Sequence, residues 1–211
     1  MTEAAAKKNT AMFMSRARRV NRRTWLIAGM LAGLLVDGPA PWAAQLRLLD
    51  LENRPVDPLR PAPEKKATVL LFVTTDCPIS NRYAPEVTRL FKSFASRGVS
   101  FWLIYPNPAD TPQAIRDHMA GFGYAMQALR DPGHALTALV HATVTPEAVV
   151  VAGERVVYRG RIDDRYVALG VERSAPARRD LENALTAVLA GKPVEHPTTE
   201  AVGCFIADFL R

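Results

Sequence analysis

Two runs that are apolar at almost every position, residues 67–73 and 99–105, stand in the middle of the chain. Both are rich in β-branched and aromatic residues and neither alternates with polar ones, which is typical of strands buried on both faces. Apolar residues recur at helical spacing from Tyr83 to Phe94, and Gly98 is expected to end that helix. A strand, a helix and a strand in this order predict a parallel crossover in an α/β domain.

The rest of the chain extends this pattern. The expected elements are an N-terminal hairpin at 46–56, a helix that Thr111 and Pro112 open and that runs to about 121, a short strand at 126–130, a short helix at 134–140, two strands at 148–151 and 155–158, and a helix at 176–190 that Gly191 ends. Parallel crossovers followed by a terminal hairpin predict a central mixed sheet flanked by helices.

The N-terminus has the composition of an export signal. Arg22 and Arg23 precede thirteen uncharged residues, which are too few to span a bilayer, and a small-residue exit follows. We interpret residues 1–44 as a signal peptide whose Arg22-Arg23 pair resembles the twin-arginine type, or as an uncleaved N-terminal anchor that would place the protein at a membrane. Residues 46–191 then form the folded domain and residues 192–211 a C-terminal tail. The expected location is the bacterial periplasm.

The net positive charge of the chain comes entirely from that leader. Residues 1–36 hold seven Lys or Arg and one Glu, whereas residues 37–211 hold twenty Lys or Arg and twenty Asp or Glu. The net charge of +6 therefore disappears when the leader is set aside. A neutral domain offers no basic face for a phosphate backbone, so we do not expect a nucleic-acid partner.

A cysteine stands where the first buried strand gives way to the first helix. Cys77 is followed by Pro78, which suits the first turn of a helix. This order of elements, with a cysteine at this junction, resembles thioredoxin. The longer middle section and the N-terminal hairpin resemble the redoxin branch of that superfamily, the AhpC/TSA peroxiredoxin-like and TlpA-like proteins, over nearly all of residues 46–191. The resemblance implies a thioredoxin-like fold with an insertion before the strand that follows the cis-proline, here Pro146.

The resemblance implies redox chemistry at the Cys77 thiol. A helix N-terminus lowers the pKa of a cysteine, Ser80 or Arg82 can support the thiolate, and Asp76 opposes it. The net direction cannot be deduced from these residues. Peroxiredoxins carry a threonine three residues before the cysteine, and Thr74 matches it, although Leu70 stands where they carry a proline.

Ser80 also occupies the place of the second cysteine of a C-x-x-C motif. Cys77 therefore cannot close a local disulfide, and another thiol has to resolve its intermediate. Cys204, in the tail, is the only other cysteine. It is expected to fold back over the active edge as the resolving thiol; the alternatives are a permanent structural disulfide and an apolar plug beside Phe205 and Ile206.

The resemblance also places the polar loop after the last strand on the active edge. Asp163, Asp164 and Arg165 would then flank Cys77, where arginine favours a thiolate and a carboxylate can move a proton; the alternative is a solvated loop. The predicted function is an exported thiol redox protein that takes a peroxide or a disulfide and a thiol electron donor. The chemistry uses the thiols alone, so we expect no cofactor and no metal.

A non-catalytic binding module is the competing hypothesis. Sco-type copper proteins share the fold and bind copper through C-x-x-x-C and a later histidine. Here Asn81 takes the place of the second cysteine, and the four histidines show no ligand spacing. Cys77, Cys204 and one histidine would have to converge to form a copper(I) site. A histidine on a helix, such as His118, is more simply expected to be solvated.

Overall fold

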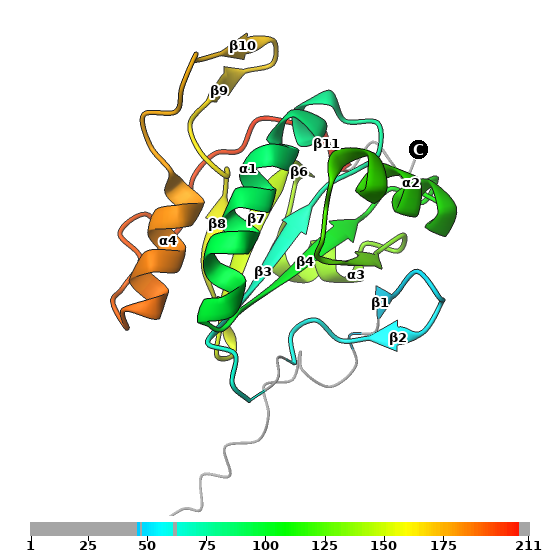
Figure 1. Ribbon diagram of the computed structural model, residues 1–211, viewed down its shortest axis with the longest axis horizontal. Helices are drawn as coiled ribbons and strands as arrows, with labels where there is room; N and C mark the ends of the chain where they lie inside the picture. Colours follow the sequence, from blue (N-terminus) through cyan, green and yellow to red (C-terminus); the bar gives the residue numbers. More distant parts are fainter. Residues whose placement is uncertain (1–45, 47, 61–62, 207–211) are drawn as a thin grey trace, which may run out of the picture. The chain divides into compact units, whose positions relative to one another are not determined.

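The computed structural model describes residues 46, 48–60 and 63–206, so the predicted leader lies outside the described residues (Figure 1). The strands are β1 (Leu48–Leu49), β2 (Pro55–Val56), β3 (Ala67–Phe72), β4 (Val99–Tyr105), β5 (Gln127–Arg130), β6 (Val144–Thr145), β7 (Glu147–Ala152), β8 (Arg155–Gly160), β9 (Tyr166–Ala168), β10 (Val171–Glu172) and β11 (Cys204–Phe205). The α-helices are α1 (Pro78–Phe94), α2 (Pro112–Phe122), α3 (Ala135–Val140) and α4 (Asp180–Leu189). None of the helices in the described ranges is long and apolar enough to cross a bilayer.

Seven strands form the central sheet in the order β2-β1-β5-β4-β3-β7-β8. Strands β3, β4 and β5 run parallel, whereas β7 and β8 pair antiparallel with the strand before them in the sheet. The two apolar runs are thus adjacent central strands, and all six residues of β3 are buried. The predicted mixed sheet with its N-terminal hairpin and terminal antiparallel pair is confirmed.

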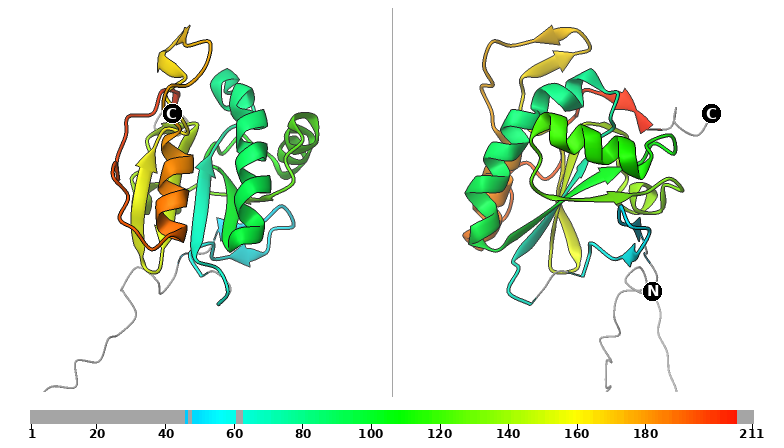
Figure 2. Two further views of the ribbon diagram at one scale, coloured as in Figure 1. Left: turned by 60° about the vertical axis from the view of Figure 1, so that its left-hand side comes forward. Right: turned by 45° about the vertical axis from the view of Figure 1, so that its right-hand side comes forward.

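Each face of the sheet has its own apolar core. Along β3, Val69 and Leu71 belong to the core beneath α1 and α4, whereas Leu70 and Phe72 belong to the core on the side of α3. Figures 1 and 2 show α1 and α4 on one face and α3 behind the sheet. This two-sided burial explains why the strand residues form continuous apolar runs.

Local signals set most helix ends as expected. Pro78 occupies the first turn of α1, and the Thr111 hydroxyl accepts a hydrogen bond from the amide of Ala114 at the start of α2. Helix α1 ends at Phe94 and a short 3-10 helix (Ala95–Arg97) leads to Gly98, whose φ of 89° lies in the left-handed region.

The C-terminal part of the fold departs from the prediction. Helix α4 begins at Asp180 and not at 176, because the carboxylate of Asp164 accepts the amides of Ala177 and Arg178 and holds them in a bend. The hairpin β9–β10 was not predicted. Nor was the pairing of β11 with β6 in a separate two-stranded sheet (Figure 1).

Candidate functional site

Cys77 lies at the junction between β3 and α1, as its N-cap residue. Its extended backbone (φ −79°, ψ 111°) turns the chain into the helix, and its sulfur accepts a hydrogen bond from the amide of Ser80 at 3.4 Å. The side chain is only 1% exposed. The thiol therefore meets the unpaired amides of a helix N-terminus in a site shielded from water.

The Cys77 sulfur meets two other segments of the chain. It donates a hydrogen bond to the carbonyl oxygen of Thr145 at 3.1 Å, and the Thr145–Pro146 peptide bond is cis. The sulfur of Cys204 lies 3.1 Å from the sulfur of Cys77, and both cysteines are free thiols. A disulfide bond is about 2.05 Å long, so a shift of about 1 Å would join the two sulfurs.

The surroundings of Cys77 lower the pKa of its thiol. Burial alone raises that pKa, but hydrogen bonds from the side chain and amide of Ser80, from Cys204 and from Thr145 outweigh burial. The hydroxyls of Ser80 and Thr145 are buried, and among the described residues neither has another hydrogen-bond partner that would compete with the Cys77 sulfur. Both are donors whose natural acceptor is the ionised sulfur, which settles the direction that the sequence left open.

The pKa of Cys204 shifts the other way, to about 12. Burial is the largest cause, followed by the hydrogen bond to Cys77 and by the negative charges of Cys77 and Asp76. Of the two sulfurs, Cys77 is therefore the one that ionises first, while Cys204 stays a thiol well above neutral pH. Asp76, expected to oppose ionisation of Cys77, contributes to keeping Cys204 protonated.

The tail reaches this position as a backbone strap, residues 197–206. Strand β11 pairs antiparallel with β6, with Cys204 opposite Thr145. A Cβ atom at Gly203 would lie 2.1 Å from the Thr145 carbonyl oxygen, so only glycine allows this approach. Upstream, the Thr199 amide donates to the Arg159 carbonyl at 3.0 Å, and downstream the Ile206 amide donates to the Thr143 carbonyl at 3.0 Å.

Thr74 has another partner than the sulfur. Its hydroxyl donates to the carboxylate of Asp76 at 2.8 Å, and the neighbouring Thr75 hydroxyl donates to Asp110 at 2.5 Å. Burial raises the pKa of Asp110 more than the hydrogen bonds from the two threonines lower it. These contacts hold the turn between β3 and Cys77.

The expectation that His118 is solvated is wrong. It is buried, its Nδ1 lies 2.8 Å from the Tyr105 hydroxyl, and its Nε2 lies 2.7 Å from Asn81 Oδ1. The Asn81 amide in turn donates to the Thr75 carbonyl at 3.1 Å. Burial lowers the pKa of His118, which favours the neutral ring. The histidine thus braces α2 against the turn that carries Cys77.

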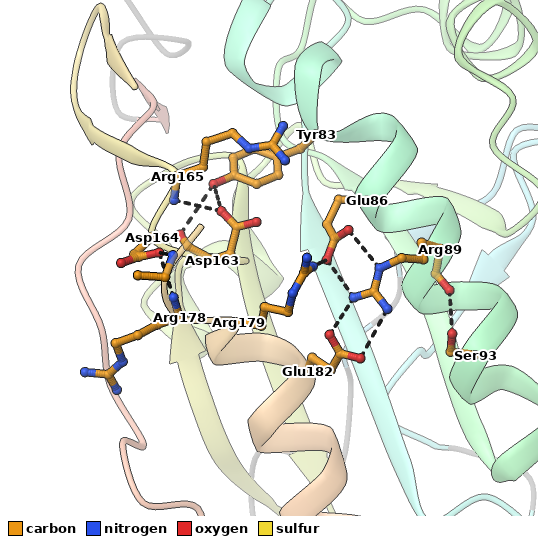
Figure 3. A network of polar contacts seen from close by, with 11 residues as sticks. Tyr83, Glu86, Arg89, Ser93, Asp163, Asp164, Arg165, Arg178, Arg179 and Glu182 are labelled. Atoms are coloured by element: carbon orange, nitrogen blue, oxygen red, sulfur yellow. Dashed lines mark hydrogen bonds and ion pairs between the residues drawn. The ribbon is translucent and has the colours of Figure 1, made fainter. Parts of the chain in front are cut away.

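The polar loop after β8 also has other partners than Cys77 (Figure 3). Asp163 accepts a hydrogen bond from the Tyr83 hydroxyl at 2.6 Å and one from the Arg165 amide at 2.9 Å. Asp164 accepts the amides that precede α4. The two carboxylates are buried, so the solvated-loop alternative does not apply to them either. In the contacts of the described residues this loop joins α1 to α4, and Arg82, expected near the thiolate, lies 3.6 Å from Glu172.

No three His, Cys, Asp or Glu side chains in the described part of the chain gather into a possible metal site. The copper hypothesis needs a histidine beside the two cysteines, and within those ranges His118 and His134 bond elsewhere, to Asn81 and to the Pro106 carbonyl. The geometry offers two thiols and a set of hydrogen-bond donors, a combination suited to thiol exchange.

Two residues of the site were missed by the sequence reasoning. Thr145 was seen only as the neighbour of Pro146, yet it faces the Cys77 sulfur with its carbonyl and its hydroxyl. Gly203 was not singled out, although a glycine directly before the tail cysteine is a signal of close backbone approach. Both contacts join segments far apart in the chain.

A thiol at the start of α1, a cis-proline beside it and this sheet order define a thioredoxin-fold protein. The model of the AhpC/TSA family matches residues 43–160, and the chain belongs to that family.

Among solved structures, an uncharacterized conserved protein from Geobacillus kaustophilus is similar at 26% identity and a TM-score of 0.65, over 76% of this chain and 87% of that one. A hypothetical protein from Sinorhizobium meliloti matches at 24% identity and a TM-score of 0.65, over 78% and 91%. A thioredoxin-like protein from Aeropyrum pernix shares the fold at 17% identity and a TM-score of 0.51, over 71% and 90%. No curated protein matches the chain.

Proposed function

We propose that this protein is an exported thiol oxidoreductase in which Cys77 is the nucleophile and Cys204 the resolving thiol. The observation that carries the proposal is the 3.1 Å separation of the two sulfurs, one with a lowered and one with a raised pKa. An attacking group must be ionised, and a low-pKa thiolate is also the better leaving group. The pair thus has one sulfur for each role.

The chemistry balances with the two thiols and an oxidant. With a hydroperoxide, the Cys77 thiolate attacks the distal oxygen, the O–O bond breaks, and an alkoxide takes up a proton to leave as the alcohol or as water. The resulting sulfenic acid is attacked by the sulfur of Cys204, which loses its proton, and water leaves as the Cys77–Cys204 disulfide forms. With a disulfide, Cys77 forms a mixed disulfide and releases one thiolate, and Cys204 displaces the other. A thiol electron donor then returns two electrons.

The supporting residues have separate roles in this proposal. Ser80 and Thr145 donate to the Cys77 thiolate, and Pro146 shapes the edge at which the substrate approaches the sulfur. Thr74 orients the turn through Asp76. Export rests on the predicted leader at 1–44 and places the reaction in the periplasm, with a membrane attachment only where the leader is retained.

Quantitative thiol labelling after one equivalent of hydroperoxide or of a small disulfide tests the proposal. In the full-length protein both thiols should disappear together, and mass spectrometry should find a peptide pair joined through Cys77 and Cys204. Cys204→Ser should stop at a Cys77 sulfenic acid that dimedone traps, or at a mixed disulfide. Cys77→Ser, the matched control, should react at least about 100-fold more slowly because the remaining thiol is protonated. An unreactive Cys77 in the unsubstituted protein would refute the proposal.

A further inference from the structure

The tail does more than deliver a second thiol, because it occupies the edge of β6 that lies next to Cys77. Cys204 stands directly opposite Thr145, in an antiparallel pair that uses the backbone of Val144 and Thr145. An extended segment of another protein that brought a cysteine within 3.1 Å of Cys77 in this orientation would need the same backbone edge. The chain has thus filled that position with a segment of its own.

The strap is secured on both sides of Cys204. Upstream, the Thr199 hydroxyl lies 2.8 Å from the Tyr158 hydroxyl and accepts the Arg161 amide at 3.1 Å. Downstream, Ile206 is 2% exposed and belongs to the apolar core on the α3 side of the sheet. A two-residue strand would be weak by itself. Anchors on both sides keep it in place and close off Cys77, which is 1% exposed.

Two glycines make this close seating possible. A Cβ at Gly160 would lie 2.2 Å from the carbonyl oxygen and hydroxyl of Thr199, and one at Gly203 would lie 2.1 Å from the carbonyl oxygen of Thr145. In both cases the obstructing atoms include backbone, so a methyl group would have to displace the strap. The close fit keeps the Cys77 sulfur covered, so a second chain cannot pair with β6 while the strap is in place.

We propose that the strap 197–206 determines substrate class, so that Cys77 takes small oxidants such as hydroperoxides and excludes disulfides held in folded proteins. This inference rests on the proposed function, because it assigns the first substrate of the same thiol. A hydroperoxide needs only a brief opening beside the sulfur, whereas a protein disulfide needs the edge of β6. The strap thereby favours oxidants that leave an intermediate on Cys77 that Cys204 can resolve from its position in the strap.

Gly203→Ala tests the role of the strap, with Gly133→Ala as its matched control. A Cβ at Gly133 meets nothing within 4 Å, and its φ is not in the left-handed region. Each substitution is made in the full-length chain, alone and together with Cys204→Ser, so that Cys77 becomes the only thiol. Hydrogen exchange at the amides of Cys204 and Ile206 reports whether the strap has lifted.

The protein without the substitution should oxidise rapidly with hydrogen peroxide and slowly with insulin disulfides. Gly203→Ala should raise the rate with insulin by about tenfold, the factor expected when one or two hydrogen bonds of the strap are lost. In the Cys204→Ser background the insulin rate divided by the peroxide rate should rise by a similar factor, because a small molecule needs only a brief opening beside the sulfur. Gly133→Ala should change neither rate.

Alkylation of Cys77 in the Cys204→Ser background separates this inference from the proposed function. The ratio of the rates with iodoacetamide and with a polyethylene-glycol maleimide should fall when Gly203→Ala is added, even in a protein that turns over no oxidant. An unchanged ratio and an unchanged insulin rate, with the strap amides exchanging freely, would overturn the inference. If the strap amides remain protected in Gly203→Ala, Ile206→Asp is used to release the strap, because it removes the anchor of the strap in the apolar core. The alkylation ratio and the insulin rate of that variant then decide the inference in the same way.

Discussion

Helix α1 borders two polar regions that differ in how completely their groups are paired. At its N-terminus the buried hydroxyls of Ser80 and Thr145 have no hydrogen-bond acceptor among the described residues other than the Cys77 sulfur, which accepts best when it is ionised. Farther along the helix, Arg89 bonds to Glu86 at 2.7 Å and to Glu182 of α4 at 2.6 Å (Figure 3). The first region offers hydrogen-bond donors to a sulfur that can gain or lose its charge. The second region consists of permanently charged side chains that are already paired.

The difference separates reactivity from stability. A matched ion-pair network gains little from any change of charge, so it joins α1 to α4 and does no chemistry. An incompletely paired site costs stability while the sulfur is a thiol and regains it when the thiolate forms. The same helix therefore carries the candidate site at its end and its structural attachment along its side.

Asp163→Ala should have the largest effect on stability. The substitution leaves the Tyr83 hydroxyl and the Arg165 amide without their acceptor in a buried place, which should lower the free energy of unfolding by about 3 kcal/mol. Urea unfolding measures it, and Asp117→Ala, at an exposed position of α2, serves as the control. The alkylation rate of Cys77 should not change. A lower alkylation rate of Cys77 with unaltered stability would instead support the predicted role of Asp163 beside Cys77.

Ser80→Ala should act on reactivity more than on stability. Without this hydroxyl the pKa of Cys77 rises, so the thiolate fraction at neutral pH falls and iodoacetamide reacts several-fold more slowly. In a pH profile the midpoint should move to higher pH while the plateau at high pH stays the same. Thr88→Val removes another buried hydroxyl without a partner on the same helix and should leave the profile alone.

The lowered pKa of Cys77 also predicts a pH dependence of stability. Because the folded pKa lies below that of the unfolded thiol, the thiolate contributes stability that is fully present above the unfolded pKa and is lost as the pH falls through the folded pKa. Chemical unfolding across this interval should show the slope in the unsubstituted protein and lose it in Cys77→Ser. An equal slope in both proteins would contradict the lowered pKa.

Arg89→Ala should have the smallest effect. Arg89 is 40% exposed, so its contacts with Glu86 and Glu182 are screened and their loss should cost about 1 kcal/mol or less. A double-mutant cycle with Glu182→Gln measures the pair, and high salt should reduce the coupling. A coupling of several kcal/mol would show that the region is as sensitive to charge as the thiol site, and the contrast between them would not hold.

Much of the fold was predictable because its causes are local. The runs that became β3 and β4 are apolar at almost every position, and burial on both faces of a parallel sheet requires that pattern. Pro78 and Thr111 set helix starts through their own backbone and hydroxyl chemistry. Helix α4 was placed too early because the bend before it depends on Asp164, a contact that no local pattern reveals.

The sequence by itself determined the order of the main helices and central strands and the position of Cys77 at a strand-to-helix junction, because periodicity and capping act between near neighbours. Only the tertiary structure decided that Cys204 lies against Cys77, that Ser80 and Thr145 outweigh burial in the pKa of that thiol, and that the Asp163 loop binds Tyr83. These outcomes depend on distances between segments as far as 127 residues apart, which are set by how the chain packs.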